Sequence, residues 1–245
     1  MPFISVRGIF VSITSWFARF DRFGSVHAVR SQDTITDSTG ADSSNSCGIA
    51  SILMINFKMK KHLMLAGMSA GAAIASSGVP LGGYIGSSLA RGAFNQAVKE
   101  EPAIYKIYSD VTGSVYDGST YSNASFYPEV LRQIGLSGWE CVVLSPSQVF
   151  DAVKTATDAG NPVIARVGWN NNGGGHFTVI DQVHPSGHVC VCDPWDAELR
   201  LIKGSSGNVI NYDSTSSVWS FSLGGNRHTG GNTGSFSGCI VRKKS

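Results

Sequence analysis

The chain has 245 residues, which suits one large domain or a compact domain with an N-terminal extension. Hydrophobic residues make up 42% and charged residues 15%, below the ~25% charged residues of an average domain, so the composition excludes a disordered polymer. The formal charge of +2 is too small to indicate nucleic acid as a partner. Five cysteines spread along the chain are an odd number, which excludes a disulfide framework.

The N-terminal 30 residues contain a short apolar run, 8–17, that could be mistaken for a signal peptide. Arg19, Asp21 and Arg22 follow closely and interrupt the apolar stretch that a signal peptide needs. We therefore expect residues 1–30 to form an arm or an amphipathic helix, followed by one domain over residues 31–245.

Residues 63–90 form a second apolar region, without a single charged side chain and rich in small residues. The length alone would allow a membrane span. Pro80, with Gly78 before it and Gly82 after it, divides the region into two pieces. We expect two short helices that pack closely inside the globule, and leave membrane contact, including a pore-forming role, as an alternative.

The rest of the chain changes from helical periodicity to an alternation of period two, which indicates strands. Helices therefore dominate the first half and antiparallel strands the second, which is an α+β arrangement. The expected helices cover 91–109, 126–134 and 145–160, and the expected strands cover 139–144, 162–167, 176–183, 188–193, 199–202, 218–221 and 239–241.

Cys47 stands where polar loop residues give way to an apolar helix. A helix N-terminus carries partial positive charge and unpaired N–H groups, which stabilise a thiolate and so activate a cysteine as a nucleophile. Gly48, the next residue, is expected to leave room for a substrate beside the sulfur.

His176 opens a predicted strand directly after the glycine-rich loop 170–175, and Asp193 ends the strand expected to pair with it. A carboxylate in that place can accept a hydrogen bond from the imidazole and fix its orientation. His176 lies 129 residues after Cys47, and Asp193 lies 146 after it. Trp169, Gly175 and Trp195 flank these residues in the sequence and are candidates for the substrate cleft.

Three short motifs carry a resemblance to a known family. Cys47-Gly-x-Ala, Gly175-His-Phe-x-Val-Ile-Asp and Asp193-Pro-Trp resemble the papain-like cysteine peptidases, and among them the bacteriocin-processing peptidases that cut after double-glycine leaders. The resemblance implies a papain-like fold, with a helical N-terminal half packed on a C-terminal antiparallel sheet. It also implies Cys47 as nucleophile, His176 as base and Asp193 as the residue that orients the histidine, with no cofactor.

The chain departs from this family at the residue that donates to the oxyanion. Family members carry a glutamine six residues before the cysteine, and Ala41 stands there in this chain. Gln32 lies farther back and is the expected substitute, with Asn45 or Ser44 as alternatives.

The resemblance implies a protease that cleaves peptide bonds in target proteins, with a preference for glycine near the cut. Stand-alone domains of this kind resemble bacterial effectors and toxins, which are delivered into a target cell by a secretion system and are held in check by a cognate immunity protein. Alternatives with the same triad are a glutamine deamidase, an acyltransferase and a peptidoglycan amidase. A catalytically silent binding module is a further alternative.

Two cysteines, Cys190 and Cys192, flank a single residue on a predicted strand and so point to one face. Ordinary zinc-ligand pairs have two to four residues between them. We interpret both cysteines as small buried hydrophobic side chains and expect no metal site. His184 and His188, at the turn between two strands, are expected to be exposed.

Overall fold

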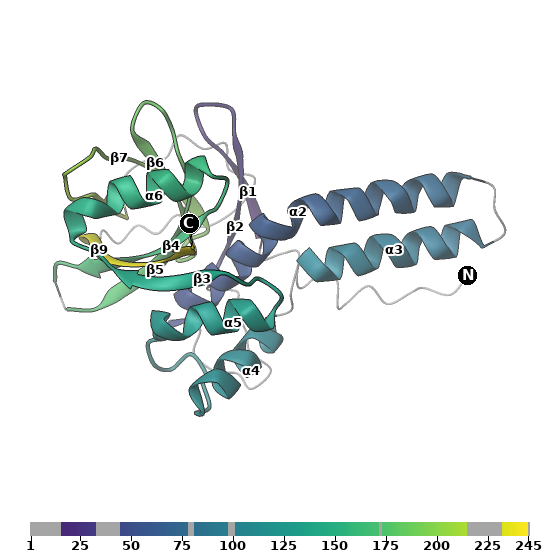
Figure 1. Ribbon diagram of the computed structural model, residues 1–245, viewed down its shortest axis with the longest axis horizontal. Helices are drawn as coiled ribbons and strands as arrows, with labels where there is room; N and C mark the ends of the chain where they lie inside the picture. Colours follow the sequence, from purple (N-terminus) through teal and green to yellow (C-terminus); the bar gives the residue numbers. More distant parts are fainter. Residues whose placement is uncertain are drawn as a thin grey trace.

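The computed structural model describes residues 16–32, 45–77, 81–97, 101–171, 173–214 and 232–244. A body that contains the main sheet carries an arm of two long helices that projects from one side (Figure 1). Residues 1–15 and the strand expected at 218–221 lie outside the described residues.

The first described element is a β-hairpin, β1 (Trp16–Phe20) paired with β2 (Val26–Arg30). The turn is fixed by Asp21, whose carboxylate accepts hydrogen bonds from the N–H groups of Phe23 and Ser25. An arm or an amphipathic helix was expected over residues 1–30. Residues 16–30 form a two-stranded sheet and not a helix.

The main sheet has seven strands, and every pairing described in it is antiparallel. Its order is β3-β9-β4-β5-β6-β7, with β8 paired to β9. The bounds are β3 Trp139–Val143, β4 Val163–Trp169, β5 Gly175–Val183, β6 His188–Asp193, β7 Glu198–Lys203, β8 Asn211–Asp213 and β9 Thr233–Lys243. Together with the helices, this sheet confirms the α+β class.

Helices cover both faces of the sheet. The smaller of two buried clusters joins α6 (Val149–Asp158), through Val149 and Val153, to one face. The other cluster joins the first turns of α2 (Cys47–Ser76), with α4 (Glu101–Thr112) and α5 (Tyr127–Gln133), to the opposite face. The alternation along β4 illustrates the division, since Val163 belongs to the α6 cluster and Ile164 to the α2 cluster. The helix expected at 126–134 is present as α5, which follows a short 3-10 turn, Ala124–Phe126.

The apolar region differs most from expectation. It is not two short helices inside the globule: α2 runs unbroken from Cys47 to Ser76, and α3 (Gly82–Ala97) returns beside it as an arm (Figure 1). The two helices approach closely at Gly86, where a Cβ atom would overlap the carbonyl oxygen of Gly71. Within the described residues, no helix is both long enough and apolar enough to cross a membrane.

Candidate active site

Cys47 is the first residue of α2 and is 5% exposed. The hydroxyl of Ser46, at the N-cap, bonds the hydroxyl of Tyr105 instead of capping the helix. The backbone N–H of Phe177, on β5, donates a hydrogen bond of 3.4 Å to the sulfur. The helix N-terminus and this donor both direct partial positive charge toward the sulfur.

His176 and Asp193 meet across neighbouring strands, β5 and β6, with 2.6 Å between Nε2 and Oδ1. Asp193 is fully buried, and its oxygens also accept hydrogen bonds from the Trp195 N–H at 2.8 Å and from the Tyr212 hydroxyl. The guanidinium of Arg200 lies 2.8 Å from Oδ2. Burial raises the pKa of Asp193, but the charges of Arg200 and His176 outweigh it and hold the pKa below its usual range. The carboxylate is therefore kept ionised and in place.

The imidazole of His176 is enclosed by two indole rings. Trp169 stacks on it with 5.6 Å between ring centroids, and Trp195 meets it edge-on at 5.4 Å. Burial lowers the pKa of His176, but Asp193 and Cys47 outweigh this effect and raise it to about 10. Because Nε2 is bonded to Asp193, the other ring nitrogen, Nδ1, is the one left for the thiol. The three predicted residues thus form one constellation.

A cleft of about 390 Å³ reaches the sulfur from outside. Residues 173–175, from the glycine-rich loop, line it together with Arg166 and a pair of thiols, Cys141 and Cys239. At Gly175 a Cβ atom would lie 2.5 Å from the Arg166 guanidinium, so a larger residue there would displace the arginine. The candidate residue Gly175 therefore does border the cleft, whereas Trp169 and Trp195 surround the histidine.

Gly48 has a different role from the expected one. The space beside its Cα is filled by the Tyr127 and Ser122 hydroxyls, which bond each other at 2.5 Å. It is not left for a substrate. Glycine is required there because the N-terminal end of α2 packs directly on Tyr127, the first residue of α5.

The two candidate oxyanion donors that the structure describes, Gln32 and Asn45, have different surroundings. Gln32 is buried, and its backbone N–H donates to the carbonyl oxygen of Pro194 at 2.7 Å, beside Asp193. The side-chain amide of Asn45 donates to the Ser119 carbonyl at 3.1 Å. Asn45 is therefore bound to the neighbouring loop, and Gln32 remains the better candidate. Ser44 lies outside the described residues.

Sequence reasoning missed three partners of the site: Tyr212, Arg200 and the Phe177 N–H. Arg200 had a signal, because it stands between two apolar residues of a predicted strand and so had to be buried or paired. Tyr212 had none, since its short strand, β8, is defined by pairing with β9. A backbone donor such as the Phe177 N–H leaves no mark on a sequence.

Scans of the sequence against protein-family models and against curated proteins give no match.

Proposed function

We propose that this protein is a papain-like cysteine peptidase that cleaves peptide bonds in other proteins. The observation that supports it most is the constellation of Cys47, His176 and Asp193, because a buried carboxylate holds the imidazole beside the thiol. The thiol lies at a helix N-terminus, the imidazole has a raised pKa, and the carboxylate has a lowered one.

The reaction has two acyl-transfer steps. The Cys47 thiolate attacks the amide carbonyl and forms a carbon–sulfur bond, while His176 gives its proton to the leaving amine as the carbon–nitrogen bond breaks. A water molecule then attacks the thioester, His176 takes its proton, and the thiolate leaves. The Cys47 N–H and the Gln32 side chain are the proposed oxyanion donors.

The lining of the cleft mixes small and bulky side chains. Glycines 173–175, Ala124 and Ser125 border it, and so do Tyr121, Arg166 and Phe177. The proposed preference for glycine near the scissile bond therefore rests on the family resemblance.

The activity is tested with a peptide library that includes Gly-Gly and Gly-Ala sequences, read by mass spectrometry. Wild type and Lys106→Ala should cleave, because Lys106 is exposed on α4 and does not line the cleft, whereas Cys47→Ala should not. Mass increases of about one unit without cleavage, which deamidation produces, would instead assign the triad to a deamidase.

We also propose that the target lies in a bacterial cytoplasm and that a cognate immunity protein blocks the cleft. Growth arrest on expression of wild type, but not of Cys47→Ala, together with truncated host proteins, is the expected result. Equal toxicity of both proteins would contradict a catalytic toxin and point to the helical arm.

A further inference from the structure

A second cluster of reactive side chains lies beneath the N-terminal hairpin, apart from the triad. His27, on β2, is 2% exposed, and its Nε2 lies 3.1 Å from Oδ2 of Asp21, in the hairpin turn. The sulfur of Cys190, on β6, lies 3.8 Å from the same carboxylate oxygen. All three ligand atoms are within 4.8 Å of one another, and all three residues are buried. Two distant parts of the chain, the N-terminal hairpin and β6, thus bring one carboxylate, one imidazole and one thiol together.

The spacing suits a tetrahedral zinc ion. Zinc binds nitrogen and oxygen at about 2.0–2.2 Å and sulfur at about 2.3 Å, so its ligand atoms stand roughly 3.3–3.5 Å apart. The observed separations, 3.1 Å and 3.8 Å, bracket that range. At the Asp21 carboxylate, an ion would require shifts of only a few tenths of an ångström, and the His27 and Cys190 ligand atoms lie within 4.8 Å of each other.

His27 also has a carboxylate partner on its second ring nitrogen, as zinc-binding histidines do. Its other ring nitrogen, Nδ1, lies 2.7 Å from Oδ2 of Asp181. A histidine that ligates a metal almost always donates its second N–H to a carboxylate or carbonyl, which fixes its tautomer and orientation. Asp181 would hold Nε2 toward the ion.

A metal ion can bind on only one side of the His27 ring, because a lysine occupies the other side. Asp181 and Cys192 form a second group with His27, but the Lys58 ammonium is already there. Its Nζ lies 2.7 Å from Asp181 and 3.6 Å from the Cys192 sulfur. A fixed cation therefore occupies that side, and Asp21 with Cys190 is left for a mobile one.

We propose that Asp21, His27 and Cys190 bind one zinc ion, with a water molecule in the fourth position. The Cys-x-Cys spacing does not count against this site, since only Cys190 of that pair is a ligand. Binding releases the thiol proton of Cys190 and the Nε2 proton of His27, and leaves the dication balanced by one carboxylate and one thiolate. Burial lowers the pKa of His27, but hydrogen bonds with Asp181, Cys190 and Cys192 raise it to about 12, so zinc must compete with a firmly held proton.

The ion would fix the hairpin to the main sheet. In the described residues β1 and β2 pair only with each other, and their turn is attached through Phe23, which stacks on His184 at 3.6 Å. The chain leaves β2 and reaches Gln32, bonded to Pro194 beside the triad. A zinc ion at His27 would therefore hold the segment that carries the proposed oxyanion donor.

The test uses the full chain with Cys47→Ala, so that the catalytic thiol cannot bind metal, and titrates it with Co²⁺ and then Zn²⁺. We expect one ion per chain, tetrahedral d–d bands and a thiolate-to-cobalt charge-transfer band, with a zinc-dependent rise in Tm. Adding Cys190→Ser should abolish the charge-transfer band. Adding Cys192→Ser, the matched control two residues away on the same face, should preserve it.

Two further variants keep the outcome decisive. Asp181→Asn should weaken zinc binding by about 10–100-fold without removing the sulfur band. Asp21→Asn, which keeps the shape of the turn, should remove the zinc-dependent rise in Tm even if Cys190→Ser does not fold. Absence of tetrahedral cobalt in the parent protein, or a band that survives Cys190→Ser but is lost with Cys141→Ser, would overturn the proposal.

Discussion

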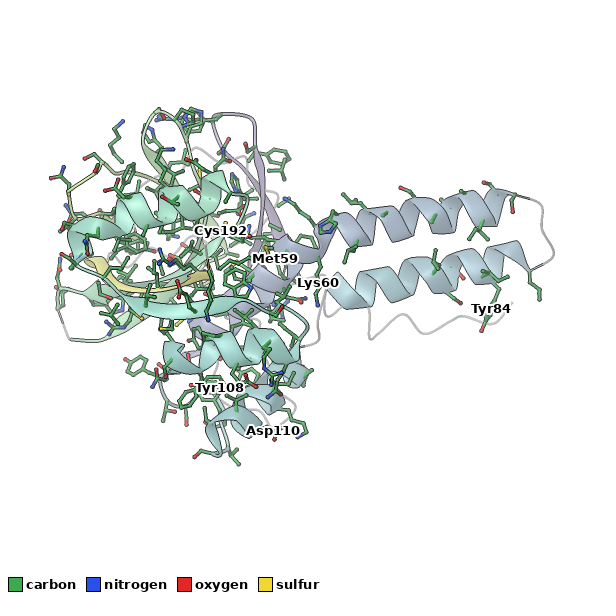
Figure 2. All side chains as sticks on the ribbon, viewed as in Figure 1. Met59, Lys60, Tyr84, Tyr108, Asp110 and Cys192 are labelled. Atoms are coloured by element: carbon green, nitrogen blue, oxygen red, sulfur yellow. The ribbon has the colours of Figure 1, made fainter. Side chains whose placement is uncertain are left out.

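The two ends of α2 belong to the same helix but stand in opposite environments. At the reactive end, Ile49, Ile52 and Ile55 are completely buried, and Cys47 faces His176. Beyond Lys61 the helix leaves the body: Leu63 and Leu65 are exposed, as is Tyr84 on the facing α3 (Figure 2). The burial of the first turns holds the proposed nucleophile, Cys47, in place, whereas the arm depends on contact between its own two helices. Substitutions at the two ends should therefore have separate effects.

The largest effect is expected from Cys47→Ala at the reactive end. Removing the nucleophile of a triad costs on the order of 10⁶-fold in kcat. The free energy of unfolding should change by less than about 1.5 kcal/mol, because only a small sulfur atom is lost. Peptide cleavage and thermal unfolding measure the two. Residual cleavage within tenfold of wild type would exclude Cys47 as the nucleophile.

The next largest effect is expected from Asp193→Asn. A neutral amide cannot hold the imidazolium, so kcat should fall by roughly 10⁴-fold, as for the equivalent change in a serine-protease triad. It also leaves Arg200 with one buried anion fewer, which should destabilise the fold by about 3–5 kcal/mol. Asp196, the other partner of Arg200, provides the control: Asp196→Asn should destabilise the protein with less loss of kcat.

Asp193→Asn should also change how stability and kcat/KM depend on pH. The pKa of His176 is raised to about 10 from its ordinary value of 6.5. Its contribution to stability is therefore complete below about 6.5 and is lost as the pH rises through about 10. In wild type the alkaline limb of kcat/KM should fall near pH 10, and in Asp193→Asn it should move to lower pH. An unmoved limb would mean that Asp193 does not act on His176.

Gly48→Ala tests the packing of the reactive end. The new methyl group would overlap the Tyr127 hydroxyl, which is buried, so we expect destabilisation of about 1–3 kcal/mol. Gly92→Ala on the arm is the matched control: an added Cβ atom would have no neighbouring segment within 4 Å, and alanine favours a helix by up to ~1 kcal/mol over glycine. The midpoint of denaturant unfolding should therefore fall for Gly48→Ala and rise for Gly92→Ala.

The arm itself should be weakened by Gly86→Ala. The added Cβ would overlap the Gly71 carbonyl oxygen, so α3 must separate from α2 or the arm must bend. Amide hydrogen exchange over residues 63–76 should become faster, while kcat stays within about twofold of wild type because the triad contacts no arm residue that the structure describes. A large loss of activity would show that the two ends of α2 are coupled.

The contrast between the two ends of α2 also shows which parts of the fold and of the site could be predicted from the sequence. Strands β3 to β7 follow from alternation, and the meeting of Cys47, His176 and Asp193 follows from motif spacing, which are local signals. Strand β8 and the first half of β9, Thr233–Gly238, were not predicted. The unbroken α2 did not follow, because residues 63–90 carry helical propensity but no sign of where the body ends. The strands β1 and β2, and the bonds of Asp193 to Tyr212 and Arg200, depend on pairing between distant segments. Such contacts are set by the tertiary fold.

The smallest effect is expected at the tip of the arm. Leu81 has a φ of 62°, in the left-handed region that costs a residue with a side chain about 1–2 kcal/mol, and it is 75% exposed. No core contact offsets that cost, so Leu81→Gly should stabilise the arm by up to ~1 kcal/mol, which slower hydrogen exchange over α3 would report. Leu89→Gly, an exposed leucine in the interior of α3, is the control and should speed exchange, because glycine weakens a helix. If Leu81→Gly also speeds exchange, the tip is held by the leucine side chain itself, and the arm has a contact at its far end comparable to those at the reactive end.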